Sequence, residues 1–377
     1  MIDFNRAVIL ENSIEYVNKA IKSQEIMGNG NYTNKCCQWM EAKFHAKKVL
    51  LTPSCTAALE MCAFLLNIKE GDEVILPSYT FVSTANAFVI RGAKCVFVDV
   101  RPDTMNIDEN KIEAAITNKT KAIVVVHYAG ISCEMDRIKK IATKYDIPIV
   151  EDAAQGVMAT YNGKFLGTFG DLGCYSFHET KNYTMGEGGA LIINNEKYIE
   201  RAEILQEKGT DRSKFFRGEI DKYSWVDMGS SYLTNDISAA YLYGQLLEAD
   251  KINDNRRVSY NNYYNLLKSL EEKQKIHLPV VPDGCRHNGH MFFVKVKDLE
   301  ERTQFINYMK EKQIHCVFHY VPLHSSAAGK KFGTFCGIDE YTTKESERLI
   351  RLPMYYGLLQ NEIEYVCKCI KKFYETE

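Results

Sequence analysis

The chain has 377 residues, 45% of them hydrophobic, and its 47 basic and 49 acidic residues leave a formal net charge of -2. This length exceeds one ordinary small domain and allows a large buried core. No block of Lys or Arg stands out, which argues against an electrostatic footprint for nucleic acid. No apolar run approaches the length of a membrane span, and the N-terminus lacks the pattern of a signal peptide. We therefore expect a globular protein that binds neither nucleic acid nor membranes.

The cysteines indicate a reducing compartment. There are twelve of them, spread along the chain without a CxxC pair. A chain of this size does not need disulfide staples. We expect free thiols and a cytoplasmic location.

Short β-rich runs alternate with segments whose apolar residues recur at helical spacing. Residues 123–126, for example, are apolar at every position, as in parallel strands that are covered on both faces. The pattern predicts an α/β fold with a mostly parallel seven-stranded sheet. The seven predicted strands are residues 48–52, 73–76, 95–100, 122–127, 148–151, 174–177 and 190–193.

The pattern changes near residue 250. Residues 236–264 are predicted as a long helix, and the stretch 277–289, which contains Pro and Gly, interrupts regular structure. We therefore predict a large domain over residues 1–250 and a smaller C-terminal α+β domain over residues 251–377. The smaller domain is expected to contain a strand at 291–296, a helix at 299–312, a strand at 315–321 and terminal helices.

Two residues that each end or follow a predicted strand suggest a cofactor. Lys181 follows the run 174–177, and Asp152 follows the run 148–151. Ligands of open α/β sheets lie beyond the carboxyl ends of the strands. A lysine amine can condense with the aldehyde of pyridoxal 5'-phosphate, and an aspartate can keep the pyridine nitrogen protonated so that the ring withdraws electrons. Each residue alone would be a surface cation or a helix cap, but together they predict a pyridoxal phosphate site with Lys181 as the catalytic residue.

Other residues at the same predicted edge fit this cofactor. Ser54, Cys55 and Thr56 open a helix after a strand, where free backbone N–H groups can hold a phosphate, although the same residues also make an ordinary N-cap. Phe81 would bring an aromatic ring to the rim to stack on a pyridine, or it is a core residue. Gln155 would bond the phenolic oxygen of the cofactor, or it caps a helix.

Five histidines that are close in sequence raise the question of a metal. No Cys or acidic partner completes a ligand set at a familiar spacing, so we expect no metal site. The residues are His287, His290, His315, His319 and His324.

With these residues in place, the chain resembles the sugar-nucleotide aminotransferases of the fold-type I pyridoxal phosphate enzymes over essentially its whole length. The order and approximate spacing of six segments carry the resemblance. They are SCTAALE (54–60), GDEVI (71–75), TFVST (80–84), EDAAQ (151–155), SFHETKN (176–182) and EGG (187–189).

The resemblance implies roles for individual residues. Lys181 would carry the cofactor, Asp152 would pair with the pyridinium, and Phe81 would stack on the ring. The residues that hold the ring oxygen and the phosphate would be Ser54, Cys55, Thr56, Gln155 and Ser176. The contacts to the sugar nucleotide would be His178, Ser231, Tyr320 and His324, with Ser231 standing where many members carry Asn.

The resemblance also implies the reaction. The segments 53–56, 176–184, 215–218 and 229–232 look most like members that aminate C4 of the sugar. They imply transfer of the amino group of L-glutamate to C4 of dTDP-4-keto-6-deoxy-D-glucose, for a surface polysaccharide. A homodimer with shared active sites is implied as well.

Three alternatives remain open. The chain is an aminotransferase for another nucleotide keto sugar, with amination at C3 or a 4-amino-gluco product, or it is a non-catalytic regulator on the same fold. A pyridoxamine-dependent sugar dehydratase is a further alternative. Lys181 argues against the last two, because a dehydratase of this fold avoids a permanent lysine bond and a regulator needs none.

Overall fold

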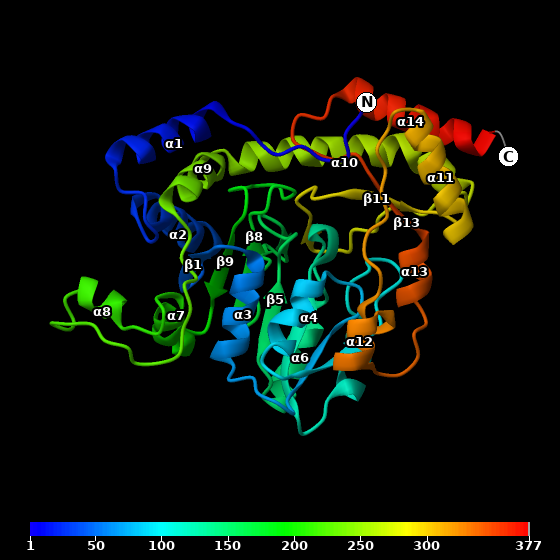
Figure 1. Ribbon diagram of the computed structural model, residues 1–377. Helices are drawn as coiled ribbons and strands as arrows, with labels where there is room; N and C mark the ends of the chain where they lie inside the picture. Colours follow the sequence, from blue (N-terminus) through cyan, green and yellow to red (C-terminus); the bar gives the residue numbers. More distant parts are fainter. Residues whose placement is uncertain (376–377) are drawn as a thin grey trace.

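The computed structural model describes residues 1–375 (Figure 1). Within these residues an eight-stranded sheet has the strand order β1-β9-β8-β5-β4-β2-β3-β12. Neighbouring strands are parallel except at β9, which is antiparallel to β1 and β8. The strands are β1 (Lys48–Thr52), β2 (Glu73–Pro77), β3 (Lys94–Val98), β4 (Thr120–Val126), β5 (Ile149–Asp152), β8 (Leu172–Ser176), β9 (Gly189–Ile193) and β12 (Gly333–Phe335). The seven predicted strands are confirmed, and β12 is an eighth from the C-terminal part.

Helices cover both faces of this sheet. Ile123 and Val125 of β4 belong to the core with α2, α6 and α9, whereas Ala122 and Val124 belong to the core with α3, α4 and α7. Strands that are apolar at every position are therefore buried on both sides, as their sequence predicts. The helices of residues 1–250 are α1 (Glu11–Ser23), α2 (Asn31–Phe44), α3 (Cys55–Leu65), α4 (Val82–Val89), α5 (Glu109–Ile112), α6 (Met135–Tyr145), α7 (Ile199–Gln206), α8 (Arg212–Phe216) and α9 (Asp236–Leu247).

The C-terminal part has its own core, to which the N-terminal Ile2 also contributes. Its small sheet pairs β11 (Phe292–Lys295) with β13 (Leu349–Leu352). Residues 285–286 form β10, which pairs with β6 (Thr160–Tyr161), and β6 pairs with β7 (Lys164–Phe165). The helices are α10 (Ala249–Glu272), α11 (Leu299–Glu311), α12 (Ala327–Phe332), α13 (Thr342–Arg348) and α14 (Gln360–Glu375). The division at residue 250 stays a prediction.

Two predicted elements of this region are wrong. The long helix over residues 236–264 is two helices, because Glu248 leaves helical geometry with φ -105° and ψ 15°. Residues 315–321 form only an isolated bridge between Val317 and Arg351. The apolar and aromatic residues that suggest a strand there instead supply the wall of a pocket, described below.

Asp99, directly after β3, joins the large sheet to α13. Its buried carboxylate accepts hydrogen bonds from the backbone N–H and the hydroxyl of Thr342 at 2.8 and 2.6 Å and from Lys111 Nζ at 2.7 Å. Burial alone would raise the pKa of Asp99, but the hydrogen bonds from Lys111 and Thr342 outweigh burial, and the pKa is lowered. The ionised carboxylate therefore fixes the beginning of α13 on the sheet.

Asp99→Asn is expected to lower the free energy of unfolding by about 3 kcal/mol at pH 7, because it removes the charge from a buried, hydrogen-bonded pair. Since the folded pKa lies below the unfolded one, this stability is present above about pH 4 and is lost as the pH falls through the folded value. Urea unfolding from pH 7 to pH 3.5 measures it. Asp3→Asn, in an exposed pair with Arg6, is the control and should cost less than about 1 kcal/mol. A difference between wild type and Asp99→Asn that stays constant below pH 4 would contradict this account.

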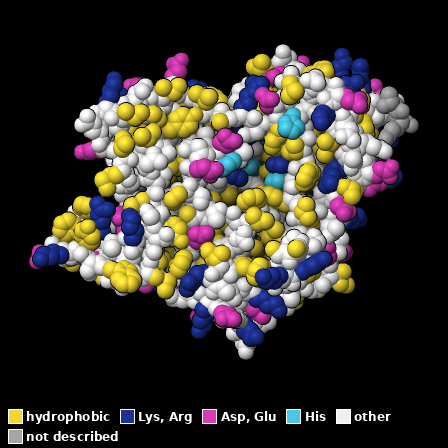
Figure 2. Space-filling model, in the orientation of Figure 1, with side chains coloured by type: hydrophobic (Ala, Val, Ile, Leu, Met, Phe, Trp, Pro, Cys, Tyr) yellow, Lys and Arg dark blue, Asp and Glu magenta, His cyan; other side chains and the backbone are white. Residues whose placement is uncertain are grey.

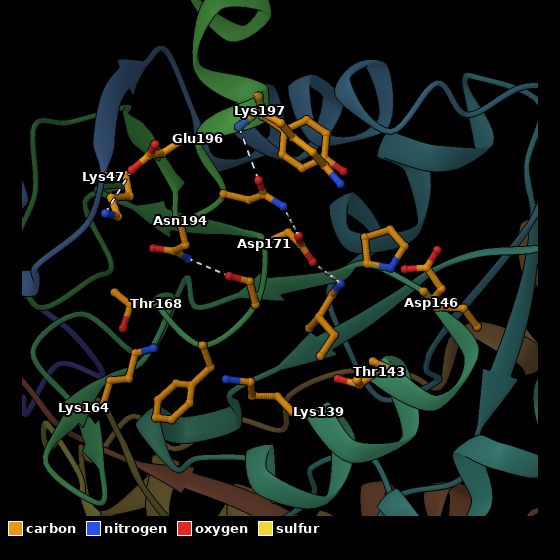
Figure 3. A pocket seen from close by; sticks show the side chains of 18 residues that line it. Lys47, Lys139, Thr143, Asp146, Lys164, Thr168, Asp171, Asn194, Glu196 and Lys197 are labelled. Carbon is orange, nitrogen blue, oxygen red and sulfur yellow. Dashed lines mark hydrogen bonds and ion pairs between the residues drawn. The ribbon is translucent and has the colours of Figure 1, made fainter.

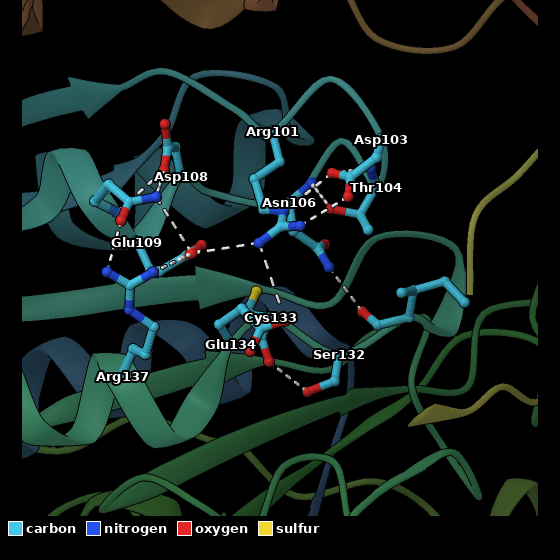
Figure 4. Close-up of polar contacts among 12 residues, drawn as sticks. Arg101, Asp103, Thr104, Asn106, Asp108, Glu109, Ser132, Cys133, Glu134 and Arg137 are labelled. Carbon is cyan, nitrogen blue, oxygen red and sulfur yellow. Dashed lines mark hydrogen bonds and ion pairs between the residues drawn. The ribbon is translucent and has the colours of Figure 1, made fainter. Parts of the chain in front are cut away.

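A second network of polar side chains joins the turn after β3 to α5 and α6 (Figure 4). Arg101 and Arg137 each place a guanidinium nitrogen 3.2 Å from the same carboxylate oxygen of the buried Glu109. In the turn between Arg101 and Glu109, Asn106 Oδ1 accepts a hydrogen bond from the backbone N–H of Tyr128 at 2.8 Å. The network thereby sets the position of Tyr128 at the end of β4.

Among residues 1–375, no helix has the length and apolar character that a membrane crossing requires.

Candidate active site

The carboxyl ends of β5 and β8 meet at one edge of the sheet. The two strands are parallel neighbours, and Asp152 pairs in register with Cys174. Lys181 lies in the turn that follows β8, and its backbone N–H donates to His178 O at 2.9 Å. Lys181 and Asp152 line one pocket, which also contains the beginning of α3 and residues of the C-terminal part. Figure 2 shows one side of the molecule, with a hollow in its middle in which histidine side chains are exposed. The structure therefore brings the predicted lysine and aspartate to the same pocket.

The side chain of Lys181 is largely buried. Burial lowers the pKa of Lys181, and the positive charge of Arg351 adds to this, while Cys55 and Asp152 act in the opposite direction. A lowered pKa increases the fraction of neutral amine. A neutral amine is the form that attacks a carbonyl carbon.

Asp152 is buried and held by two donors. Its Oδ2 accepts from Thr84 Oγ1 at 2.7 Å, and its Oδ1 accepts from the backbone N–H of Ala154 at 3.2 Å. Burial raises the pKa of Asp152, against the effect of these hydrogen bonds. A buried carboxylate of this kind is stabilised as an anion by a cation placed opposite it.

The residues of the predicted cradle lie at the beginning of α3. Ser54 is the N-cap, and its hydroxyl oxygen accepts from the backbone N–H of Ala57 at 3.0 Å. The N–H groups of Cys55 and Thr56 are in the first turn, where a helix supplies no partner for them. A Cβ on Gly189 would lie 2.4 Å from the Cys55 nitrogen, so β9 approaches the cradle this closely only because residue 189 is glycine. Ser54 is therefore an N-cap, and its part in a phosphate cradle stays a prediction.

Phe81 and Gln155 lie at the same pocket. Phe81 is 56% exposed in the single chain, so it is not a core residue, and its ring lies 6.2 Å from that of Tyr320. Gln155 Oε1 accepts from the Ala129 N–H at 2.6 Å, and its Nε2 donates to the Tyr320 hydroxyl at 3.0 Å. Gln155 thus ties Tyr320 of the C-terminal part to the end of β5 rather than capping a helix.

Of four further residues predicted to bind cofactor or substrate, two line the pocket and two do not. Ser176, at the end of β8, and His178 line the pocket, and His178 Nε2 is 3.4 Å from Glu187. Ser231 and His324 are not brought to the pocket. His324 Nδ1 is 2.7 Å from Ser78 Oγ and its Nε2 is 3.2 Å from Asp339, and Ser231 bridges to Glu207. Their contacts to a sugar nucleotide stay predictions.

Residues of the C-terminal part that the sequence did not assign to the cofactor form one wall of the pocket. They are His290, His319 and Arg351. His319 Nδ1 lies 2.8 Å from the Tyr128 hydroxyl, and the His319 ring stacks on Tyr320 at 3.6 Å. Arg351 donates to the Phe318 carbonyl oxygen at 3.0 Å. Within the described residues, no group of three or more His, Cys, Asp or Glu side chains is placed to hold a metal ion.

A second cleft lies at the opposite ends of β5 and β8 (Figure 3). Two of its polar side chains bond turns of the chain itself. Asn194 donates to the carbonyl oxygens of Gly167 and Gly170, at 3.1 and 2.9 Å, and Asp171 accepts from the backbone N–H of Ile149 at 3.2 Å. These contacts join neighbouring turns.

The comparisons with known proteins agree with this site. The family model described as the DegT/DnrJ/EryC1/StrS aminotransferase family matches residues 8–371. The chain belongs to this family. It is an aminotransferase that acts on sugars and depends on pyridoxal 5'-phosphate.

Two curated relatives and one solved structure illustrate the family. An uncharacterised protein of Methanocaldococcus jannaschii, MJ1066, is 36% identical over 97% of this chain and 96% of its own length. GDP-perosamine synthase of Escherichia coli O157:H7 is 31% identical over 96% of each chain. Spr1654 of Streptococcus pneumoniae, described as a sugar aminotransferase and solved in its PMP form, has a TM-score of 0.90 and 27% identity, with 100% of each chain covered. A PLP form of the same protein has also been solved.

Pyridoxal 5'-phosphate fits the pocket of this family member. Cys55 and Thr56 would offer backbone N–H groups to its phosphate, the buried carboxylate of Asp152 would pair with its pyridinium nitrogen, and Lys181 would present an amine with a lowered pKa. Bound there, the cofactor would supply a carbonyl carbon for the amine and a ring that withdraws electrons. Thr84, which the sequence left out, would hold Asp152 in place.

Proposed function

We propose that the protein transfers the amino group of L-glutamate to C4 of dTDP-4-keto-6-deoxy-D-glucose. The product is dTDP-4-amino-4,6-dideoxy-D-galactose, made in the cytoplasm for a surface polysaccharide. The observation that supports the aminotransferase chemistry is that Lys181, Asp152 and the beginning of α3 line one pocket. The choice of C4 and of this sugar is supported by the resemblance of segments 53–56, 176–184, 215–218 and 229–232 to members that aminate C4.

In this reaction Lys181 is the group that moves protons. Its Nζ would take the proton from Cα of glutamate and, in the reverse sense, give a proton to C4 of the sugar. Asp152 would pair with the ring nitrogen of the bound cofactor and keep it protonated. Because one amine binds and leaves as a keto acid before the keto sugar binds, the kinetics are ping-pong.

The polar rim of the pocket would orient the sugar. His178 is 39% exposed in its side chain and lies beside Glu187. Tyr320 is held by Gln155 on the other side. These hydroxyl, imidazole and carboxylate groups suit a ligand rich in hydroxyls. We assign them to the keto sugar rather than to glutamate.

The test is to incubate the pure enzyme with L-glutamate and a panel of dTDP-, UDP- and GDP-linked keto sugars and to solve each product by NMR. The expected product carries the amine at C4 in the galacto configuration. The relative GDP-perosamine synthase gives the alternative, since its name specifies a GDP-linked product. Selective turnover of a GDP sugar, amination at C3 or a gluco product would each overturn this assignment of substrate and leave the aminotransferase chemistry in place.

We further propose a homodimer with shared active sites. Apolar side chains are exposed on α1 and around α8, among them Ile14 at 50%, Phe216 at 68% and Trp225 at 81%. Figure 2 shows hydrophobic side chains gathered over these elements. Exposed apolar patches of this kind are typical of interfaces. A second copy of the chain would cover them.

A dimer is therefore expected by sedimentation at the enzyme concentration of the assay. Trp225→Glu is expected to weaken it by at least roughly tenfold in Kd, because a charge would be buried at the interface. Ile338→Glu is the matched control, since Ile338 is 82% exposed and lies between α12 and α13, on the other side of the molecule from α1 and α8 (Figure 1). A wild-type monomer with full activity would refute shared sites.

A further inference from the structure

Arg351, on β13, brings a guanidinium to the wall of the pocket that contains Lys181. Its Nε and Nη2 atoms both donate to one acceptor, the carbonyl oxygen of Phe318, at 3.3 and 3.0 Å. Its Nη1 atom has no hydrogen-bond acceptor within residues 1–375. A guanidinium carries five N–H donors, so several of those of Arg351 are available to a ligand.

The chain itself does not compensate the charge of Arg351. The side chain is half-buried, and burial lowers its pKa. In the part of the chain that the structure describes, no Asp or Glu side chain pairs with it, and the groups that act on it electrostatically are Tyr79, Tyr128 and Tyr320. A cation that is partly removed from water gains most from an anion as its partner. The wall of the pocket therefore favours an anionic ligand at this place.

The other basic side chains of this wall do not supply a fixed positive charge. Burial lowers the pKa of His290 and of His319 well below the ordinary value, so both rings are uncharged. The pKa of Lys181 is lowered as well, and its amine is the group that would bond the cofactor. Arg351 is thus the side chain of the pocket wall that is left to bind an anionic group of a substrate.

The place of Arg351 favours one anion over the others that the reaction brings. Its charge acts on the amine of Lys181, so the guanidinium lies near the reacting atoms. In an amino acid the α-carboxylate is attached to the carbon whose proton Lys181 would take. In a sugar nucleotide the hexose ring separates C4 from the pyrophosphate, and the phosphate of the cofactor is expected at the beginning of α3.

We propose that Arg351 binds the α-carboxylate of the amino donor and thereby selects an α-amino acid rather than a simple amine. The planar guanidinium matches a carboxylate with two parallel hydrogen bonds. The ring of Phe4, which also lines the pocket, lies 4.7 Å from the guanidinium carbon and would keep its plane in place. The inference deepens the proposed function and rests on it for glutamate as the donor. It does not depend on which sugar is the substrate.

The experiment measures the two half-reactions of the holoenzyme separately by stopped-flow absorbance. Arg351→Gln is expected to lower the second-order rate constant with L-glutamate by roughly 30- to 100-fold, because hydrogen bonds between charged groups are the strong ones. The half-reaction with the keto sugar, which has no carboxylate, should change by less than about threefold. Arg302→Gln is the matched control, because Arg302 also lies over the Phe318 ring, at 5.5 Å, and does not line the pocket.

A series of amino donors separates the α-carboxylate from the side-chain carboxylate. L-Glutamine lacks the side-chain carboxylate, and 4-aminobutyrate lacks the α-carboxylate. Arg351→Gln is expected to lower the rate constants of L-glutamate and L-glutamine by the same factor and to leave that of 4-aminobutyrate unchanged. A loss confined to L-glutamate overturns the proposal, as does an equal loss with the keto sugar or in Arg302→Gln.

A second measurement uses the wild type alone and so does not depend on the folding of a variant. L-2-Methylglutamate has no proton on Cα and cannot complete the half-reaction. In a crystal structure of the holoenzyme with this analogue, its α-carboxylate should lie about 3 Å from nitrogen atoms of Arg351. An α-carboxylate held by other residues overturns the proposal. If the wild type takes no amino group from L-glutamate, the proposed donor is wrong, and Arg351→Gln is then measured with the amino acid that does react.

Discussion

Lys181→Ala is expected to lower kcat by at least roughly 10⁴-fold while the protein stays folded. The variant loses both the amine that bonds the cofactor and the base that moves the proton, so both half-reactions stop. The alanine is accommodated because Lys181 lies in a turn beside the pocket and no strand pairing depends on it. Steady-state kinetics with circular dichroism measures both expectations.

The matched control is Lys164→Ala, a lysine of the second cleft, at the other end of the sheet. It is expected to keep near-normal kcat. Borohydride reduction of the wild type should fix the cofactor on the peptide that contains Lys181. Trapping on any other lysine would show that the catalytic residue has been misassigned.

Asp152→Asn is expected to slow the glutamate half-reaction by roughly 10³-fold while the cofactor still binds. An amide would not hold the ring nitrogen of the cofactor protonated, so the ring would withdraw electrons less strongly when the proton leaves Cα. The phosphate cradle and Lys181 are untouched, which is why binding survives. Stopped-flow absorbance after mixing with glutamate isolates this half-reaction.

Asp146→Asn is the control for Asp152→Asn, since Asp146 is an exposed residue at the end of α6 that lines only the second cleft. Its half-reaction should match the wild type. Thr84→Val is expected to give an intermediate loss, because it removes one donor to the carboxylate and leaves the charge. A near-normal rate in Asp152→Asn would rule out the role assigned to this aspartate.

The sequence predicted the parts of the site that local pattern determines. Asp152 ends β5, Lys181 and the residues at Ser54 follow strands, and the carboxyl ends of parallel strands meet at one edge. The wall from the C-terminal part was not predictable in this way. Arg351 reaches the pocket from β13, and its position depends on pairing across the chain rather than on neighbouring residues. No periodicity in its own segment indicates that partner.

The sequence pattern also did not indicate where helices are interrupted or where the eighth strand lies. The residues around Glu248 keep helical spacing, and only tertiary packing turns them into two helices. Residues 333–335 are too short and too exposed to be read as a strand, yet they pair with β3. Thr84 belongs to the segment 80–84 that carries the family resemblance. Its hydrogen bond to Asp152 depends on how α4 lies beside β5, which the sequence pattern does not indicate.

The pairing of β12 with β3 has a consequence for biosynthesis. β3 leaves the ribosome about 240 residues before its outer neighbour, counting from Lys94–Val98 to Gly333–Phe335. Until then an apolar strand has one side open, which is the usual template for aggregation. A nascent chain of this protein therefore needs protection over most of its synthesis. Messages that end before residue 333 should yield insoluble fragments rather than a smaller working enzyme.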